Sequence, residues 1–337
     1  MVSIIIVNWN GKMFLERNLS SVFSQTFQQF EVILVDNGST DWSVEFVRLH
    51  FPDVIIIENK ENLGFAKGNN QGIRAAKGKY IATLNNDTVV DKEWLSNLVN
   101  VAESSENHVG MWAPKILSMK EPAKIDSVGG LLIYKDGIAR GRGRGKEDKG
   151  QFDKVEGILF PSACSALYRK DMLDDVGLFD EDLFAYCEDT DLGLRGRLAG
   201  WKAVSVPDAV VYHHYSGSTG TYSEIKAFLV ERNHIWVAIK NFPASMVVLM
   251  PFYTLLRWTV QLLHAAKGTG ATSSYVKEVS IIRILVVLIK ACLSALWGTP
   301  MIWKKRAAIQ KRRVISINEV RKLLREYRLS AAEVVSE

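Results

Sequence analysis

The chain has 337 residues, of which 23% are charged and 47% hydrophobic, a balance typical of globular proteins and unlike that of disordered ones. Its net charge of +5 is too small to indicate a nucleic-acid-binding protein, so no nucleic acid is expected as a partner. Three scattered cysteines, Cys164, Cys187 and Cys292, form neither a disulfide framework nor a zinc spacing, which favours a reducing, cytoplasmic compartment. The apolar run Val2–Val7 is short and lacks the basic flank of a signal peptide.

Apolar runs alternate with helix-like segments over about the first hundred residues. We expect buried strands at Ser3–Val7, Glu31–Val35, Val54–Ile57 and Tyr80–Leu84, with helices at Phe14–Phe23, up to Leu49, and at Ala66–Ala76. This alternation predicts an α/β fold with a mainly parallel sheet flanked by helices. Ligands of such sheets bind beyond the carboxyl ends of the strands, where Asn8, Asp36 and Asp87 are found.

From His108 the pattern becomes less regular. Further strands are expected at Met111–Lys115, Gly130–Tyr134 and Val204–Tyr212. The basic, glycine-rich run Arg140–Lys146 is either a solvated loop or a mobile flap that touches an anionic ligand. We therefore expect one catalytic domain over residues 1–240, with a nucleotide-binding half (1–105) and an acceptor-binding, catalytic half (106–240).

The remaining residues, 241–337, have a different character. Met246–Leu263 is apolar but interrupted by Arg257, and Val279–Trp297 is apolar but contains Arg283 and Lys290. Neither has the ~20 uninterrupted apolar residues of a spanning helix. From residue 304 to residue 328 there are ten basic and two acidic side chains. We expect amphipathic helices and a basic tail lying on the anionic inner face of the cell membrane. The alternative is a pair of ordinary helices packed on the catalytic domain or on a partner subunit.

The polar triplet Asn85-Asn86-Asp87, with two amides and one carboxylate, follows the fourth strand. Oxygen ligands suit Mg²⁺ or Mn²⁺, and such ions take one or two carboxylates while substrate phosphates complete the shell. Asp87 would be the main charged ligand. The alternative is a structural aspartate at the end of a strand.

An acidic cluster, Glu188-Asp189-Thr190-Asp191, places three acids within four positions. Mutual repulsion raises at least one pKa in such a cluster. Asp191 and Arg195 are four residues apart and can pair on a helix. The remaining two acids can orient a hydroxyl group and accept its proton. The alternative is a solvated acidic helix start.

Three weaker patterns complete the set. Asp36 can accept a hydrogen bond from the N3–H of a uracil or thymine ring, or it can be a turn residue. The run Asn59–Asn70 places glycines at a strand-to-helix junction, which permits phosphate binding or a simple capped turn. His213-His214, followed by Ser216, Ser218 and Thr219, can supply a metal or phosphate ligand.

The motifs in this order resemble those of family 2 glycosyltransferases with a GT-A fold, in the subgroup usually labelled rhamnosyltransferase-like. The resemblance runs from Val2 to about Pro243. It is carried by Val2–Gly11, Asp36–Asp41, Asn62–Ala66 with Gly68–Asn70, Leu84–Asp87, Glu188–Leu192 and His213.

The resemblance implies a site for a nucleotide sugar and a cation. The residues implied for the nucleotide are Asn8, Asp36, Asn37, Gly64, Asn69 and Asn86, with Asp36 reading the base of a UDP- or dTDP-sugar. Asp87, with His213 or His214, would hold Mg²⁺ or Mn²⁺ against the diphosphate. Asp189 would be the general base, supported by Glu188 and Asp191.

The resemblance also implies the reaction. An inverting hexosyltransferase of this family would move a sugar, with rhamnose favoured by the subgroup's label, to a hydroxyl of a glycan or lipid-linked acceptor in cell-surface polysaccharide or cell-wall synthesis. Two other hypotheses remain open. A nucleotidyltransferase uses a similar sheet but would release pyrophosphate, and a non-catalytic membrane-bound scaffold would bind no nucleotide.

Overall fold

The computed structural model describes residues 1–214, 223–266 and 281–335, and it divides into two compact units. The first unit comprises Met1–Leu131, Gly141–Arg197 and Trp201–Gly220, and the second comprises Leu132–Arg140, Leu198–Gly200 and Thr221–Glu337. Ser216, Ser218 and Thr219, which sequence analysis singled out after the histidines, lie outside the described residues.

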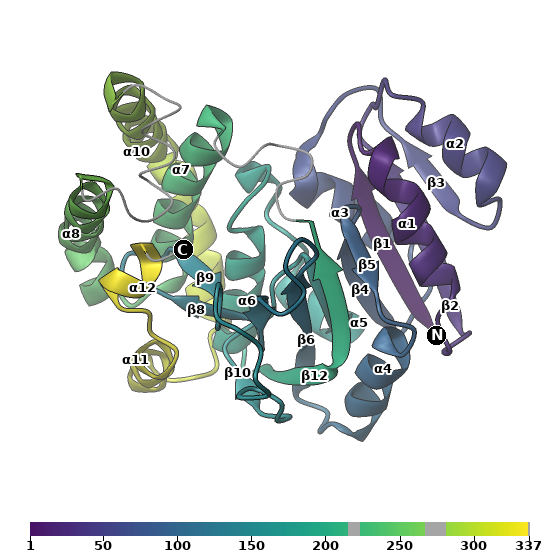
Figure 1. The fold of residues 1–337 in the computed structure, drawn as a ribbon. Coiled ribbons are helices and arrows are strands. Elements are labelled where there is room, and N and C mark those ends of the chain that lie inside the picture. Colours follow the sequence, from purple (N-terminus) through teal and green to yellow (C-terminus); the bar gives the residue numbers. More distant parts are fainter. Residues whose placement is uncertain (215–222, 267–280, 336–337) are drawn as a thin grey trace. The chain divides into compact units, whose positions relative to one another are not determined.

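The first unit is built on a ten-stranded sheet in the order β10-β12-β6-β11-β4-β1-β2-β3, with β5 paired to β12 and β7 paired to β6 (Figure 1). Its strands are β1 (Val2–Asn8), β2 (Phe30–Asp36), β3 (Ile55–Glu58), β4 (Tyr80–Asn85), β5 (Thr88–Val90), β6 (Val109–Ser118), β7 (Ile125–Val128), β10 (Gly157–Ile158), β11 (Ser165–Arg169) and β12 (Lys202–His213). The longest ladders, β1 with β2 and β6 with β12, are parallel. The sheet is therefore mixed but mainly parallel.

Helices cover both faces of this sheet (Figure 1). They are α1 (Lys12–Phe23), α2 (Ser43–His50), α3 (Gly64–Ala75), α4 (Trp94–Ser104), α5 (Lys170–Val176) and α6 (Glu188–Leu198), with a 3₁₀ turn, η1 (Glu181–Leu183), before α6. Along β1, Ile4 and Ile6 join the core formed with α1 and α4, whereas Ile5 faces Gly72 of α3. Burial on both faces explains why β1 is a continuous run of apolar residues.

The strands expected from the sequence are confirmed as β1, β2, β3, β4, β6, β8 (Leu131–Ile133) and β12, and so is the layered α/β fold. Four later strands, β5, β7, β10 and β11, depart from the regular parallel alternation. β11 runs antiparallel between β4 and β6, so it interrupts the parallel order at the centre of the sheet. Its five residues carry no alternating pattern, because all five are buried. A short, fully buried segment of this kind gives no periodic signal for its direction.

The second unit contains α7 (Glu224–Asn241), α8 (Ala244–Ala266), α10 (Ile281–Arg312), α11 (Ile317–Glu326), α12 (Ala331–Val335) and the ribbon of β8 (Leu131–Ile133) with β9 (Ala139–Gly141). α10 lies close against α7. Trp236 donates a hydrogen bond from Nε1 to the carbonyl of Ala295 at 3.0 Å, and a Cβ on Gly298 would lie 2.4 Å from the Trp236 ring. The boundary between the two compact units falls before α7, because α7 packs with the helices that follow it.

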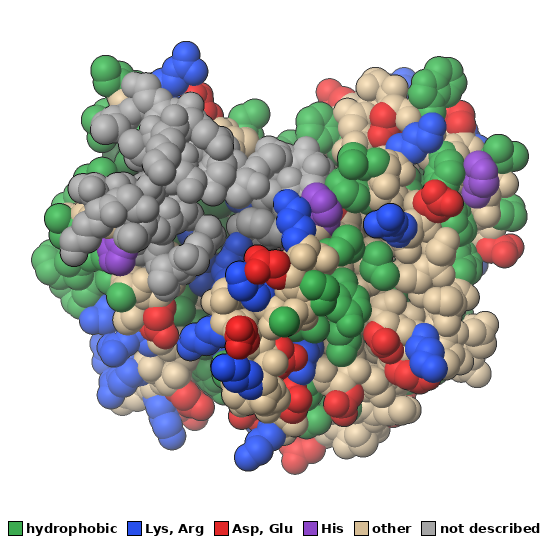
Figure 2. Space-filling view, in the orientation of Figure 1, with side chains coloured by type: hydrophobic (Ala, Val, Ile, Leu, Met, Phe, Trp, Pro, Cys, Tyr) green, Lys and Arg blue, Asp and Glu red, His purple; other side chains and the backbone are tan. Residues whose placement is uncertain are grey.

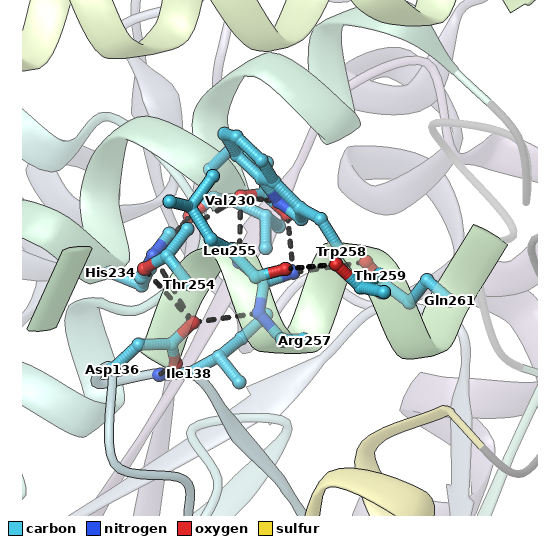
Figure 3. A network of polar contacts seen from close by, with 11 residues as sticks. Asp136, Ile138, Val230, His234, Thr254, Leu255, Arg257, Trp258, Thr259 and Gln261 are labelled. Atoms are coloured by element: carbon cyan, nitrogen blue, oxygen red, sulfur yellow. Dashed lines mark hydrogen bonds and ion pairs between the residues drawn. The ribbon is translucent and has the colours of Figure 1, made fainter. Parts of the chain in front are cut away.

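A buried ionic network ties α7, α8 and the β8–β9 ribbon together (Figure 3). Arg257 of α8 donates to both carboxylate oxygens of Glu231, at 2.7 and 2.8 Å, and from Nε to Asp136 Oδ2 at 2.7 Å. Thr254 and His234 also face Asp136. Arg257, Asp136 and His234 are fully buried, so the residue that interrupts the apolar run of α8 points into the protein.

The opposite faces of α8 and α10 are apolar and exposed. The exposed side chains are Val248, Leu249, Phe252, Leu255, Leu256, Leu262 and Leu263 on α8, and Ile282, Leu285, Val286, Ile289, Leu293, Leu296, Trp297, Met301 and Trp303 on α10. Figure 2 shows hydrophobic side chains gathered over α8 and basic ones over α11. By length and composition alone, Ala244–His264 and Ile282–Arg312 could each cross a membrane.

Candidate functional site

The ends of β1, β2 and β4 are joined by a chain of amide and carboxylate contacts. Asn8 donates from Nδ2 to Asp36 Oδ1 at 2.9 Å, and its Oδ1 accepts from Asn86 Nδ2 at 2.7 Å. Ser39 donates to both oxygens of Asp36, at 2.6 and 2.8 Å. Asn8, Asp36 and Asn86 are buried. They meet because β1 pairs in parallel with β2 and β4, which brings the carboxyl ends of the three strands to one edge of the sheet. The carboxylate of Asp36 retains lone-pair capacity for a further donor such as a ring N–H.

Gly11 is required for this arrangement. A Cβ at Gly11 would lie 2.2 Å from Asn86 Nδ2 and 2.5 Å from Asn8 Oδ1. Because the two amides meet over its backbone, a larger residue would separate them. This explains a glycine directly before α1, which begins without a side-chain cap.

Asp87 lies next to His213, at the end of β12. His213 Nε2 is 3.3 Å from Asp87 Oδ1, and His213 Nδ1 is 2.7 Å from Asp126 Oδ2. The register of β5 with β12, which pairs Thr88 with His213, brings these residues together. Burial opposes a charged imidazole, but Cys164 and the carboxylates of Asp126 and Asp87 outweigh it, so the pKa of His213 is well above its usual value.

His214 occupies a different position from His213. Its backbone N–H donates to the carbonyl of Asp87 at 2.9 Å, while its ring lies 5.1 Å from the ring of Phe14. Of the two histidines that sequence analysis left open, His213 is therefore the one whose imidazole faces Asp87.

The donor set of Asp87 and His213 fits a cation that takes its other ligands from a substrate. Within residues 1–214, 223–266 and 281–335, no group of three or more His, Cys, Asp or Glu side chains is placed to hold a metal. One carboxylate and one imidazole leave most of an octahedral shell to diphosphate and water. The imidazole nitrogen is a softer donor than the oxygens that Mg²⁺ prefers, so the pair suits Mn²⁺ better.

Glu188, which is buried, and Asp189, which is half-buried, are adjacent at the start of α6. Asp189 accepts hydrogen bonds from the backbone N–H groups of Ala163, at 3.2 Å, and Thr190, at 2.7 Å. Burial, and then the charge of Asp189, raise the pKa of Glu188 to about 8. Burial also raises the pKa of Asp189, against the lowering effect of its hydrogen bonds. The cluster is thus a desolvated carboxyl pair and not a solvated helix start.

The turn before β11 contacts both the Glu188–Asp189 pair and the residues around Asp87. Ala163 binds Asp189, and the next residue, Cys164, is within hydrogen-bonding reach of His213. The carbonyl of Cys164 also accepts from the backbone N–H of Asn85, at 2.8 Å. Asp87 and Asp189, a hundred residues apart in the sequence, therefore lie on either side of one short turn. Neither Cys164 nor Ala163 carries a motif that sequence reasoning could have used.

Asp191, which the resemblance placed beside the general base, faces away from this pair. Its carboxylate is fully buried and accepts from Arg195 Nε at 2.9 Å, as the four-residue spacing predicts. Arg195 in turn donates to the carbonyls of Val176, Gly177 and Leu178. Asp191, through Arg195, therefore anchors α6 to the end of α5 and the segment that follows it.

The junction before α3 is occupied by protein. The backbone N–H of Ala66 donates to the carbonyl of Phe184 at 3.0 Å. Gly64 has φ +85°, and a Cβ there would lie 2.6 Å from the same carbonyl. The close approach that Gly64 permits is thus to Phe184. Asn37 donates to the carbonyl of Gly64 at 3.1 Å, and Asn69 donates to the carbonyl of Phe65 within α3.

The segment before the acid pair is strained. Phe184 has φ 64° and ψ −66°, and the N–H of Ala185 donates to the carbonyl of Leu183 at 2.7 Å, which makes a γ-turn. Tyr186 and Cys187 also have positive φ. Such conformations are unfavourable for non-glycine residues and gather at functional sites. Upstream of this segment, Asn70 binds both the N–H and the carbonyl group of Phe179.

Two ion pairs hold the basic run Arg140–Lys146, and one of them reaches the site. Arg142 pairs with Glu156 at 2.6 Å, and Arg144 Nη1 lies 3.5 Å from Asp126 Oδ1. Asp126 itself was not among the residues singled out from the sequence. Its only signal is an acid at the start of a short strand, and its proximity to His213 depends on the sheet order.

Comparison with known proteins identifies the family. The chain matches the model described as Glycosyl transferase family 2 over residues 3–177. The N-acetylglucosaminyl-diphospho-decaprenol L-rhamnosyltransferase of Mycobacterium tuberculosis is 27% identical over 275 residues, which cover 70% of this chain and 86% of that protein. An uncharacterized glycosyltransferase of Haemophilus influenzae is 30% identical over 114 residues, and the chain covers 35% of its length.

Solved structures show the same fold. The mannosyltransferase PcManGT from Pyrobaculum calidifontis, in complex with GDP-Man and Mn²⁺, superposes with a TM-score of 0.56 at 17% identity, over 88% of this chain and 87% of that one. TarS 1–349 of S. aureus in complex with UDP-GlcNAc gives 0.55 at 16%, over 97% and 91%. These likenesses establish the GT-A fold. Because the family model covers more than half of its residues, this chain belongs to glycosyl transferase family 2.

Proposed function

We propose that the protein transfers a sugar, with inversion, from a UDP- or dTDP-sugar to a hydroxyl group of a glycan or lipid-linked acceptor. The observation that carries this proposal is the position of Asp189. Its half-buried carboxyl, with a raised pKa, is held by the turn that also contacts His213 and Asn85. A raised pKa makes a carboxylate a better proton acceptor near neutral pH.

In this proposal each residue has one task. Asp36, supported by Asn8 and Asn86, accepts a hydrogen bond from the base of the nucleotide. Asp189 orients the acceptor hydroxyl and takes its proton as the oxygen attacks the anomeric carbon from the face opposite the diphosphate. Glu188 lies beside Asp189, and its own pKa is raised by burial and by the charge of Asp189. A divalent cation held by Asp87 and His213 would stabilise the charge on the departing diphosphate.

The donor and acceptor are inferred from relatives. The mycobacterial relative is named as a rhamnosyltransferase acting on N-acetylglucosaminyl-diphospho-decaprenol. A dTDP-linked deoxyhexose donor and a polyprenyl-diphosphate-linked sugar acceptor are therefore the first pair to assay. The site residues Asn37, Gly64 and Asn69 would frame the donor pocket indirectly, through the contacts that position the α3 junction.

The Asp189→Asn variant tests the assignment of the base. We expect kcat to fall by about 10²- to 10⁴-fold, because a carboxamide cannot accept the proton. Calorimetry should show that UDP or dTDP binds as in the wild type. Asp174→Asn, an exposed acid on α5, is the matched control and should keep full activity. Full turnover by the Asp189 variant contradicts the assignment.

Product analysis separates this proposal from a nucleotidyltransferase. A glycosyltransferase releases a nucleoside diphosphate, whereas a nucleotidyltransferase releases pyrophosphate. Chromatography of the reaction products with each nucleotide sugar, with and without Mn²⁺, distinguishes the two.

We also propose that the second unit holds the enzyme on the cytoplasmic face of an anionic membrane. The exposed apolar stripes of α8 and α10 are the support, together with Trp297, which is 90% exposed, and the basic residues that follow it. Aromatic side chains of this kind favour the membrane interface, and basic ones favour anionic headgroups. Because Arg257 and Thr254 pack one face of α8 against the protein, only the opposite face can meet lipid, as in a helix that lies in the interface.

A further inference from the structure

The carboxylate of Asp126 is bound to the far side of the imidazole that faces Asp87. Asp126 lies on β7 and His213 at the end of β12, and β6 separates these two strands. The register pairs Leu117 with Ile125 and Ser118 with His213, so Asp126 and His213 come from neighbouring rows of the sheet. Their contact is therefore set by rigid elements and not by loops.

The geometry decides which nitrogen of His213 is the donor to Asp126. Nδ1 is 2.7 Å from Asp126 Oδ2, a hydrogen-bond distance, and a carboxylate oxygen accepts. Nδ1 must therefore carry a proton. Nε2, on the other side of the ring, faces Asp87 Oδ1 at 3.3 Å, and a cation bound between these two atoms would replace the proton held there. A carboxylate behind a histidine in this way fixes both the tautomer and the ring orientation.

The second oxygen of Asp126 is also engaged. Arg144 Nη1 lies 3.5 Å from Asp126 Oδ1. Asp126 and Arg144 are both largely shielded, with side-chain exposures of 16% and 22%. The guanidinium balances the charge of a carboxylate that would otherwise add a second negative group near Asp87. This gives the basic run Arg140–Lys146 a role in the site that does not require contact with a substrate.

We propose that Asp126 is a positioning residue, which holds His213 so that Nε2 and Asp87 together present their lone pairs to one divalent cation. The inference rests on the proposed function, because it assumes that a cation binds at Asp87 with the nucleotide diphosphate. It adds a residue outside all the motifs that carried the family resemblance. An ion pair that serves only the fold is the competing explanation.

The test measures Mn²⁺ binding directly, without turnover. Free Mn²⁺ is titrated by electron paramagnetic resonance in the presence of UDP or dTDP, for the wild type and for Asp126→Asn. Loss of an outer carboxylate lowers metal affinity by about 10- to 100-fold, and we expect a loss of that size. Pulsed measurements should also show a weaker ¹⁴N coupling from the histidine nitrogen to the bound Mn²⁺.

Further variants separate positioning from folding. Glu156→Gln removes the carboxylate partner of Arg142 in the same region and should bind Mn²⁺ as the wild type does. If Asp126→Asn does not fold, as judged by its melting curve, Asp126→Glu takes its place, because a longer side chain keeps the charge but displaces the imidazole. It should give an intermediate loss.

The outcomes distinguish this inference from the proposal on which it rests. Wild-type binding that depends on Asp87, with unchanged affinity and ¹⁴N coupling in the Asp126 variants, overturns the positioning role alone. A wild-type protein that binds no Mn²⁺ with either nucleotide overturns the metal proposal and this inference with it.

Discussion

Glu188 and Asp189 are two adjacent acids, the first buried and the second half-buried, at the start of one helix. Burial disfavours their charged forms, and the charge of Asp189 further disfavours that of Glu188, so the pKa of Glu188 rises to about 8. Water would solvate such a pair on a surface and leave both acids ionised at neutral pH. Ionising both acids in the folded protein therefore costs free energy, which a purely structural role would not require.

This cost predicts a pH-dependent stability. A carboxyl whose pKa is raised in the folded state stabilises the fold below its unfolded pKa, and that contribution is lost as pH rises through the folded value. The melting temperature of the nucleotide-free protein should therefore fall between about pH 5 and about pH 8. In Glu188→Gln this decline should be smaller, and the variant should melt at a higher temperature than the wild type at the alkaline end.

Glu181→Gln is the matched control for that measurement. Glu181 is a nearby acid on η1 whose pKa is lowered, because the hydrogen bonds from Asn70 and Arg74 outweigh its burial. Its removal should lower the melting temperature without changing the alkaline decline. Equal slopes for the wild type and Glu188→Gln would show that Glu188 is ionised in the fold without cost.

At the scale of single elements, α8 is defined by its two faces. Met250, Thr254 and Arg257 point inward, while Val248, Phe252 and Leu255 are exposed on the outside. Burial pushes the pKa of Glu231 upward, but the guanidinium of Arg257 more than compensates, so the net pKa is lowered. The same order of effects lowers the pKa of Asp136. Both carboxylates are therefore charged partners of one arginine.

Removing that arginine should destabilise the second unit strongly. Breaking a buried ion pair from one side costs about 3–5 kcal/mol, because the remaining charges stay buried without their partner. Arg257→Ala should therefore become sensitive to limited proteolysis across α7 and α8 at temperatures where the wild type resists.

Gln261→Ala serves as the control for Arg257→Ala. Gln261 contributes only a 3.3 Å contact at the edge of the network, so its loss should be nearly neutral. Arg257→Met fills the same volume with apolar atoms but also leaves Glu231 and Asp136 unpaired, so it too should be unstable. Wild-type resistance in both Arg257 variants would mean that the network does not hold α8.

At the scale of the whole molecule, a catalytic unit is joined to a helical unit with large exposed apolar stripes. Soluble monomers rarely expose such surfaces without a partner. The stripe residues recur every three or four positions along α8 and α10, which is the spacing of one helix face. A bilayer of anionic lipid matches both the stripes and the basic residues after them.

Vesicle sedimentation tests this partner. The wild type should sediment with phosphatidylglycerol vesicles, less with phosphatidylcholine vesicles, and less again at high salt. Leu255→Asp combined with Leu293→Asp should weaken binding by about 10- to 100-fold, since each exposed leucine would otherwise bury its side chain. Leu49→Asp, which changes a 77% exposed leucine on α2, is the control and should bind as the wild type does. Equal sedimentation of all three would exclude the stripes as the binding surface.

Much of this organisation could be predicted from local sequence. The alternation of buried strands with helices, the pairing of Asp191 with Arg195 and the two faces of α8 all depend on residues within about one element's length of each other. The carboxyl ends of β1, β2 and β4 share an edge because these strands run parallel to one another. Asn8, Asp36 and Asn86 meet there for that reason.

The remaining features depend on contacts between distant segments, which no periodicity encodes. The position of β11 in the centre of the sheet, the carbonyl of Phe184 at the start of α3 and the contact of Asp126 with His213 each join residues that are far apart in the chain. The local sequence determined which residues could form strands and helices and where the acidic residues fall along them. Tertiary packing alone decided which of these acidic residues became neighbours, because the distances between their side chains depend on the order of strands in the sheet and not on their order in the chain.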